Sequence, residues 1–185
     1  KSHQVQDILP DRKMGTIRDH FLRFPRAARE RVQSVVIDMY TPYLVLIPQL
    51  FPNAQIIIDT FHLVQLLNRS LNQTRIKLMN QFRSSDPKDQ KKYRKLKRYW
   101  KLVLKKGWDL DFTNYTYQRL FKGMKTEAGI IDYLISLGDE FKQTYEAHQN
   151  LIYAIQTKDY DRFMTGLSSV SKEISSYLKT SIRTL

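Results

Sequence analysis

The chain has 185 residues, 42% of them hydrophobic, and it contains no cysteine. The hydrophobic fraction supports a folded core and argues against wholesale disorder, while the lack of cysteine excludes disulfides and thiolate metal sites. Lysine and arginine number 31 against 18 acidic residues, and the net charge of +13 favours a polyanionic partner, either nucleic acid or an anionic membrane. No apolar run approaches the roughly 20 residues of a membrane span, so we expect no membrane segment.

The first half of the chain alternates between helix-like and strand-like segments. Residues 16–24 carry apolar side chains at helical spacing and stop at Pro25, which predicts a short helix. Residues 32–37 (VQSVVI) and 55–58 (QIII) are rich in β-branched side chains, a composition typical of buried strands. These two runs are therefore predicted to be short strands.

A helix is expected between the two strands and another after them. Thr41 can cap the first helix with Pro42 at its first position, and Pro48 must end or kink it. The second helix is expected from Thr60 onward. Residues 32–80 therefore predict a β-α-β-α unit with two parallel strands joined by a right-handed crossover.

Asp38 and Asp59 each follow one of the predicted strands. The carboxyl ends of parallel strands meet at one edge of the sheet, where active sites of such folds lie, so we expect both carboxylates there. Aspartates at that edge can hold Mg²⁺, but they also commonly cap the next helix, and spacing alone favours capping. His62 lies in the first turn after Asp59, and Asp-x-x-His by itself is a weak signal for a metal or acid–base pair.

Most of the positive charge falls in one element. Residues 83–106 hold eleven Lys or Arg and two Asp, a net +9 of the total +13, with Tyr93, Tyr99 and Trp100 interleaved. Such a run is often only a solvated helix face, but the concentration of charge favours contact with a polyanion, which would be salt-dependent and not sequence-specific. The expected nucleic-acid-binding side chains are Lys91, Lys92, Arg94, Lys95, Lys97, Arg98, Lys101 and Lys105.

The remainder of the chain is predicted to be helical. Apolar residues recur at helical spacing over residues 127–156 and again from residue 159 onward. This pattern predicts two long helices that pack antiparallel about a turn near residues 157–159.

One combination of motifs is specific although its parts are not. A strand ends in Asp38-Met39, a short helix carries Tyr43, a turn reads Phe51-Pro52-Asn53-Ala54, and a strand ends in Asp59-Thr60-Phe61-His62. In this combination, residues 35–75 closely resemble the insertion-sequence transposases of the ISL-three family.

The resemblance implies an RNase H-like catalytic domain of the DDE type. In such domains three carboxylates bind two Mg²⁺ (or Mn²⁺) ions, which drive the cutting and joining of DNA phosphodiester bonds. Asp38 would be the second catalytic aspartate and a metal ligand, and Asp59 and His62 would be its active-site neighbours. The implied partner is DNA, as terminal inverted repeats and as target, together with further copies of the full-length transposase. The implied location is the prokaryotic cytoplasm, with the protein on the nucleoid when it is DNA-bound.

The resemblance also implies an interior fragment, because the family's first catalytic aspartate and its glutamate find no match here. The expected fold class is α/β plus all-α, predominantly helical overall. Residues 1–82 would form a partial RNase H-like domain built on the β-α-β-α unit, and residues 83–185 a basic, all-helical insertion region. We expect this fragment to bind DNA without catalysing transposition alone, and without necessarily holding a metal.

Two alternatives stay open at this stage. The helical half alone is compatible with a non-catalytic nucleic-acid-binding or protein-interaction module. A small α/β phosphotransfer domain with Asp38 as acceptor is a further possibility, although the few strands and the long helical half count against it.

Overall fold

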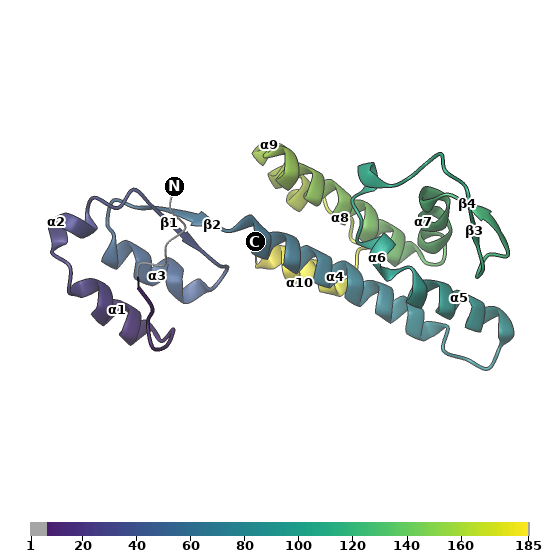
Figure 1. The fold of residues 1–185 in the computed structure, drawn as a ribbon, viewed down its shortest axis with the longest axis horizontal. Coiled ribbons are helices and arrows are strands. Elements are labelled where there is room, and N and C mark those ends of the chain that lie inside the picture. The colour runs from purple at the N-terminus through teal and green to yellow at the C-terminus, as the bar shows by residue number, and fades with distance from the viewer. Residues whose placement is uncertain (1–6, 185) are drawn as a thin grey trace. The chain divides into compact units, whose positions relative to one another are not determined.

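The computed structural model describes residues 7–184 and divides into two compact units between His62 and Leu63, each described by itself below (Figure 1). Residues 1–6 and 185, which the predicted ranges 1–82 and 83–185 include, lie outside the described residues. The division differs from the predicted boundary after residue 82. The reason is that most of the helix beginning at Thr60 packs into the second unit, where Leu67, Leu71 and Leu78 are buried.

The first unit has a β-α-β crossover preceded by two helices: α1 (Met14–Leu22), α2 (Arg26–Arg29), β1 (Ser34–Ile37), α3 (Thr41–Leu50) and β2 (Gln55–Ile58). The strands are parallel, with Ser34 paired to Gln55 and Ile37 paired to Ile58. Both strands lie within the ranges expected from their β-branched composition. Two strands and a crossover occur in many α/β folds, so the RNase H-like assignment stays a prediction.

The core of this unit covers one face of the two-stranded sheet. Helices α1 and α3 lie on the same side of the strands (Figure 1), and their apolar residues pack with Ile37 of β1. Side chains alternate along a strand, so Val36 points the other way and is 63% exposed, while Ile57 is 42% exposed. Parallel sheets are normally buried on both faces, and here the second face is open among the described residues.

The helix between the strands departs from its prediction at both ends. Thr41 is already its first residue and Tyr40 is its N-cap, without a side-chain capping bond, so the predicted Thr41 cap is wrong. Pro48 lies inside the helix, which continues to Leu50. Proline removes one intrahelical hydrogen bond, which the buried side chains of Leu46, Ile47 and Leu50 compensate by packing.

The second unit is mainly helical. Its elements are α4 (Thr60–Gln81, whose first three residues belong to the first unit), α5 (Pro87–Arg98), α6 (Trp100–Val103), the 3-10 helix η1 (Gly107–Asp109), β3 (Thr116–Gln118), β4 (Gly123–Lys125), α7 (Glu127–Ile135), α8 (Asp139–Thr157), α9 (Tyr160–Ser168) and α10 (Ser176–Arg183). Its core is built from the apolar stripes of α4, α7 and α8. No helix in the described part of the chain is long and apolar enough to cross a membrane.

The prediction that residues 83–185 are all-helical is wrong. Strands β3 and β4 form an antiparallel hairpin in which Tyr117 pairs with Met124. Each strand has three residues, too few for a helical or alternating pattern to stand out. The four-residue loop between them ends at Lys122, which has a φ of 52°.

The two long helices predicted after residue 127 are each divided. Helix α7 ends at Ile135 and α8 begins at Asp139. Gly138, between them, passes close to Leu78: a side chain there would meet Leu78 Cδ1 at 3.0 Å. Helix α9 ends at Ser168, and α10 begins only after Ser175, whose hydroxyl accepts the Leu178 N–H at 3.3 Å. The predicted turn near residues 157–159 is present, and α8 and α9 pack against each other.

Candidate functional site

The two candidate carboxylates follow strands that end side by side. The backbone N–H of Asp59 donates to the carbonyl of Ile37 at 2.9 Å, one step beyond the last strand pair, Ile37 with Ile58. Asp38 and Asp59 therefore leave the sheet at the same edge. Both side chains are partly exposed, so solvent and ligands can reach them.

Each carboxylate uses one oxygen to start the segment that follows it. Asp38 Oδ1 accepts the Tyr40 N–H at 3.2 Å, and Asp59 Oδ1 accepts the Phe61 N–H at 2.9 Å. Asp59 thus caps α4, whereas Asp38 forms a turn before α3, whose N-cap is Tyr40 with no side-chain capping bond. Within residues 7–184 no hydrogen bond uses either Oδ2 atom, so each aspartate keeps an oxygen available for a ligand.

His62 belongs to the helix start that Asp59 organises. Its backbone N–H donates to the Asp59 carbonyl at 3.1 Å, and its ring packs edge-on against Phe61 with centroids 5.6 Å apart. No three His, Asp or Glu side chains of residues 7–184 form a group able to hold a metal ion. Asp38 fits one carboxylate ligand of a hard cation such as Mg²⁺, but a complete two-metal centre needs carboxylates that these residues do not bring together.

A cavity of about 430 Å³ opens beside Asp38. It is lined by Arg12, Lys13, Met14, Asp38, Tyr40 and Tyr43. Lys13 is paired with Asp11 at 3.2 Å, whereas Arg12 is exposed and takes part in no ion pair of the described chain. Sequence reasoning missed these two cations; the signal available was the Asp-Arg-Lys run just before the first helix.

Five of the eight predicted nucleic-acid-binding side chains form an exposed basic surface on α5 and α6. They are Lys91, Arg94, Lys97, Arg98 and Lys101, all exposed and outside the ion pairs of residues 7–184. Lys91, Arg94 and Arg98 are separated by three and four residues, a spacing that puts them on one face of α5. We call these five side chains the basic surface.

The other three predicted side chains are engaged inside the fold. Lys92 pairs with Asp89 at 3.2 Å, and Lys105 pairs with Glu127 at 2.5 Å. Lys95 extends over two rings, 4.2 Å from the Phe121 centroid and 4.0 Å from that of Tyr133. The Lys92 pair lies within α5, whereas the contacts of Lys95 and Lys105 hold α5 and the segment after α6 against α7 and the hairpin loop.

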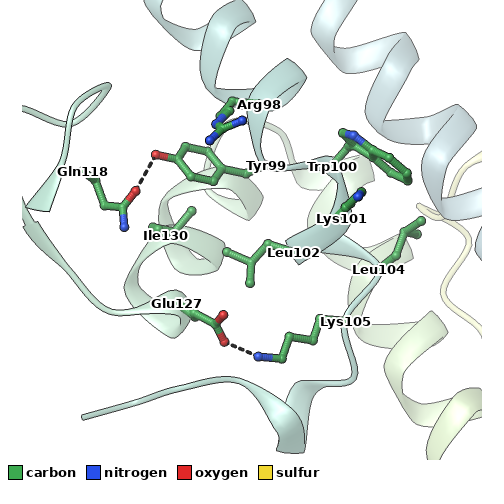
Figure 2. A pocket seen from close by; sticks show the side chains of 10 residues that line it. All are labelled: Arg98, Tyr99, Trp100, Lys101, Leu102, Leu104, Lys105, Gln118, Glu127 and Ile130. Atoms are coloured by element: carbon green, nitrogen blue, oxygen red, sulfur yellow. Dashed lines mark hydrogen bonds and ion pairs between the residues drawn. The ribbon is translucent and has the colours of Figure 1, made fainter. Parts of the chain in front are cut away.

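A hollow of about 820 Å³ adjoins the basic surface (Figure 2). Figure 2 shows the Lys105–Glu127 ion pair at one end and the Tyr99 hydroxyl bound to Gln118 Oε1 at 3.0 Å at the other. The hydrogen bond from Lys105 lowers the pKa of the Glu127 carboxyl, which favours its ionised form. Arg98 and Lys101 line the same hollow, with no acidic partner among the described residues.

A parallel strand pair with an aspartate edge, a compact helical unit and a basic surface together suit a protein that acts on a nucleic acid. The family model described as a transposase, of the DDE type and ISL3 group, matches residues 1–185. The chain therefore belongs to the ISL3 family of transposases.

One curated relative is the transposase for insertion sequence element IS1001 from Bordetella parapertussis. It is 36% identical over 85 residues, which make up 45% of this chain and 21% of the relative. The match thus spans about a fifth of the relative's length. No solved structure matches the chain significantly.

Proposed function

We propose that this chain is part of a transposase that cuts and joins DNA phosphodiester bonds. The observation that carries the proposal is the family match over residues 1–185. The position of Asp38 supports it, because the carboxyl edge of a parallel sheet is where active sites of α/β folds lie.

Asp38 is the residue we assign to catalysis and to a divalent metal, Mg²⁺ or Mn²⁺. Its free Oδ2 is the oxygen available to such an ion, which would supply Lewis-acid stabilisation and an activated nucleophile. Asp59 and His62 act as neighbours: Asp59 shares the edge, and both residues build the first turn of α4. Arg12 faces the same cavity as Asp38 and can meet the phosphate of a substrate.

The proposed partner is DNA, as inverted repeats and as target, with the protein acting on the nucleoid in the cytoplasm. The basic surface supplies phosphate contacts because its five cations are exposed and unpaired within the described chain. Contacts of this kind position the protein without reading sequence. The complete transposase would also self-associate, with both DNA ends held by separate copies.

This polypeptide alone is proposed to bind DNA without transposing it. The carboxylates of a two-metal centre are not gathered within residues 7–184. The open face of β1 and β2, with Val36 and Ile57 exposed, is the surface on which further parts of a catalytic domain would pack.

The test is a salt titration of duplex DNA binding by the 185-residue chain. Log affinity should fall linearly with log salt, with a slope of about −0.9 for each phosphate contacted. Binding that stays constant between low and moderate salt would contradict phosphate contact. Metal-dependent strand transfer by this polypeptide would contradict its proposed incompleteness.

A second candidate function is a non-catalytic nucleic-acid-binding module. The observation that favours it is that the second unit holds the whole basic surface and has its own core. An experiment on a complete transposase that contains this segment distinguishes the two candidate functions. Asp38→Ala abolishes DNA cleavage under the first and leaves function intact under the second.

A further inference from the structure

The hairpin of β3 and β4 presents an uncovered face. Tyr117 and Met124 are a cross-strand pair, so their side chains leave the hairpin on the same side. Tyr115 lies just before Thr116, the first residue of β3. Tyr117 is 67% exposed, Tyr115 is 64% exposed and Met124 is also exposed. We call these three side chains the aromatic face.

The opposite side of the hairpin is fastened to the rest of the second unit. Gln118 Oε1 accepts the Tyr99 hydroxyl at 3.0 Å, and the loop residue Phe121 lies under the Lys95 ammonium. Phe121 also packs edge-on against Tyr133, with centroids 5.0 Å apart. The aromatic face is therefore held in place by contacts behind it, while no described residue covers its front.

The hairpin itself carries only cations, although Asp111 and Glu127 stand at its two flanks. Residues 112–126 contain Arg119, Lys122 and Lys125 and no Asp or Glu. A patch that combines exposed aromatic rings with cations suits a ligand with both apolar faces and negative charge. Bases of a single strand offer their π-faces to aromatic side chains while the phosphates meet the cations. In a duplex those π-faces are stacked on each other and cannot receive a tyrosine ring.

The side of the hairpin opposite the aromatic face adjoins the basic surface. Gln118 of β3 lines the same hollow as Arg98 and Lys101 (Figure 2). The same hollow is also lined by Glu127, which is paired with Lys105. The hairpin and the end of α5 therefore lie close together in the second unit, and a strand that extends past the edge of the hairpin would meet Arg98 and Lys101.

We propose that the aromatic face binds unpaired bases of single-stranded DNA, with Tyr117 as its central stacking residue. The choice of DNA rests on the proposed function. The proposal adds a second mode of contact, in which bases stack on the hairpin while the basic surface holds the backbone.

The test compares a short fluorescein-labelled oligodeoxythymidine with a blunt duplex of equal length, using fluorescence anisotropy on the 185-residue chain. Tyr117→Ala should weaken binding of the single strand roughly tenfold, the usual cost of losing one stacked base, and change duplex binding less than twofold. Tyr117→Phe keeps the ring and should keep the affinity. A 2-aminopurine placed in the oligonucleotide should lose fluorescence on binding to the wild-type chain.

Tyr160→Ala is the matched control, since Tyr160 is 71% exposed at the start of α9. It should leave single-strand binding unchanged, and circular dichroism should show that all variants fold. The proposal is overturned if Tyr117→Ala binds the oligonucleotide as tightly as wild type, or if 2-aminopurine fluorescence does not change. It is also overturned if Tyr117→Ala only dissociates an oligomer in sedimentation, because a second copy would then be the occupant. If replacing Arg94 and Lys97 with alanine left the affinity for duplex DNA unchanged, the proposed role of the basic surface would be contradicted. The stacking role of Tyr117 would not be affected by that result.

Discussion

The N–H of Asp59 reaches the carbonyl of Ile37 at 2.9 Å, and this backbone bond makes β1 and β2 end in step. The bond needs neither aspartate side chain. Each carboxylate accepts only one hydrogen bond, from a backbone N–H of its own following segment. Substitution by asparagine, which retains an oxygen acceptor at Oδ1, should therefore remove the negative charge and preserve the backbone conformation at this edge of the sheet.

The first prediction concerns this edge in a complete transposase that contains the segment. Asp38→Asn should lower DNA cleavage by about a thousandfold or more, because losing a metal-binding charge removes several kcal/mol of transition-state stabilisation. Asp59→Asn should cost about 10- to 100-fold at most, as is usual for outer-shell partners. Gel assays of cleavage at inverted-repeat DNA measure both. Substantial cleavage by Asp38→Asn would remove Asp38 from the metal site.

The second prediction separates exposed from engaged cations. Replacing both Arg94 and Lys97 with alanine should make the salt dependence of duplex binding shallower, by about 0.9 in slope for each phosphate that is no longer neutralised. Lys105→Ala is the control, because Lys105 is occupied by Glu127. It should leave the slope unchanged and cost at most about 1 kcal/mol of stability, the range of partly exposed ion pairs. An equal change in slope for each charge removed would show that net charge alone matters.

The third prediction concerns His148 of α8, which is buried. Its Nε2 lies 2.8 Å from Asn68 Oδ1, so this nitrogen carries the hydrogen, and Nδ1 has no partner among the described residues. Burial lowers the pKa of His148 to about 4. The unfolded chain, with a histidine pKa of about 6.5, then binds a proton before the folded chain does. Stability should fall as pH drops from about 6.5 to about 4.

The size of this effect is on the order of 3 kcal/mol across the window, at about 1.4 kcal/mol per pH unit. His148→Gln keeps a donor for Asn68 and removes the titration. Urea unfolding of both proteins at several pH values measures the difference, and carboxylates common to both cancel. Parallel stability curves for wild type and variant would contradict the assignment.

The fourth prediction concerns the turn between α8 and α9. Lys158 closes α8 in the left-handed region, at φ 56° and ψ 33°, and the Asp159 N–H returns to the Ala154 carbonyl at 2.9 Å. This position normally holds glycine. Lys158→Gly should raise the free energy of unfolding by about 0.5–1 kcal/mol. Lys158→Ala, which removes the charge but keeps the strain, should give no gain; equal stability of the two variants in urea would refute the explanation.

Some of this architecture could be predicted because the signals are local. The runs VQSVVI and QIII are rich in β-branched residues and each is followed by an aspartate. Neighbouring residues therefore suffice to predict the two strands and the position of both aspartates at the edge of the sheet. The hairpin could not be predicted in the same way. Tyr115 and Tyr117 alternate with Thr116, and Lys122-Gly123 suits a turn, but three-residue strands carry too little pattern.

Other features depend on tertiary contacts that no local pattern encodes. The apolar stripe of α4 predicts a buried helix face but does not indicate which unit's core buries it. A boundary placed at the change in composition near residue 83 therefore falls about 20 residues after the observed one. Similarly, nothing in the basic run distinguishes Lys95, which reaches the Phe121 and Tyr133 rings, from Arg94 beside it. The serine-rich stretch after Ser168 was the available sign that α9 ends early.

Arg75 of α4 fixes the end of α5, the helix that carries most of the basic surface. Its buried guanidinium donates to the Leu96 carbonyl at 2.8 Å and to Asn72 Oδ1 at 2.9 and 3.0 Å, so the last turn of α5 is tied to α4. Desolvation lowers the pKa of Arg75, although an arginine remains charged at physiological pH. The backbone that carries Arg94, Lys97 and Arg98 is thus preorganised, so the proposed DNA binding would order only side chains and lose less entropy for each phosphate held.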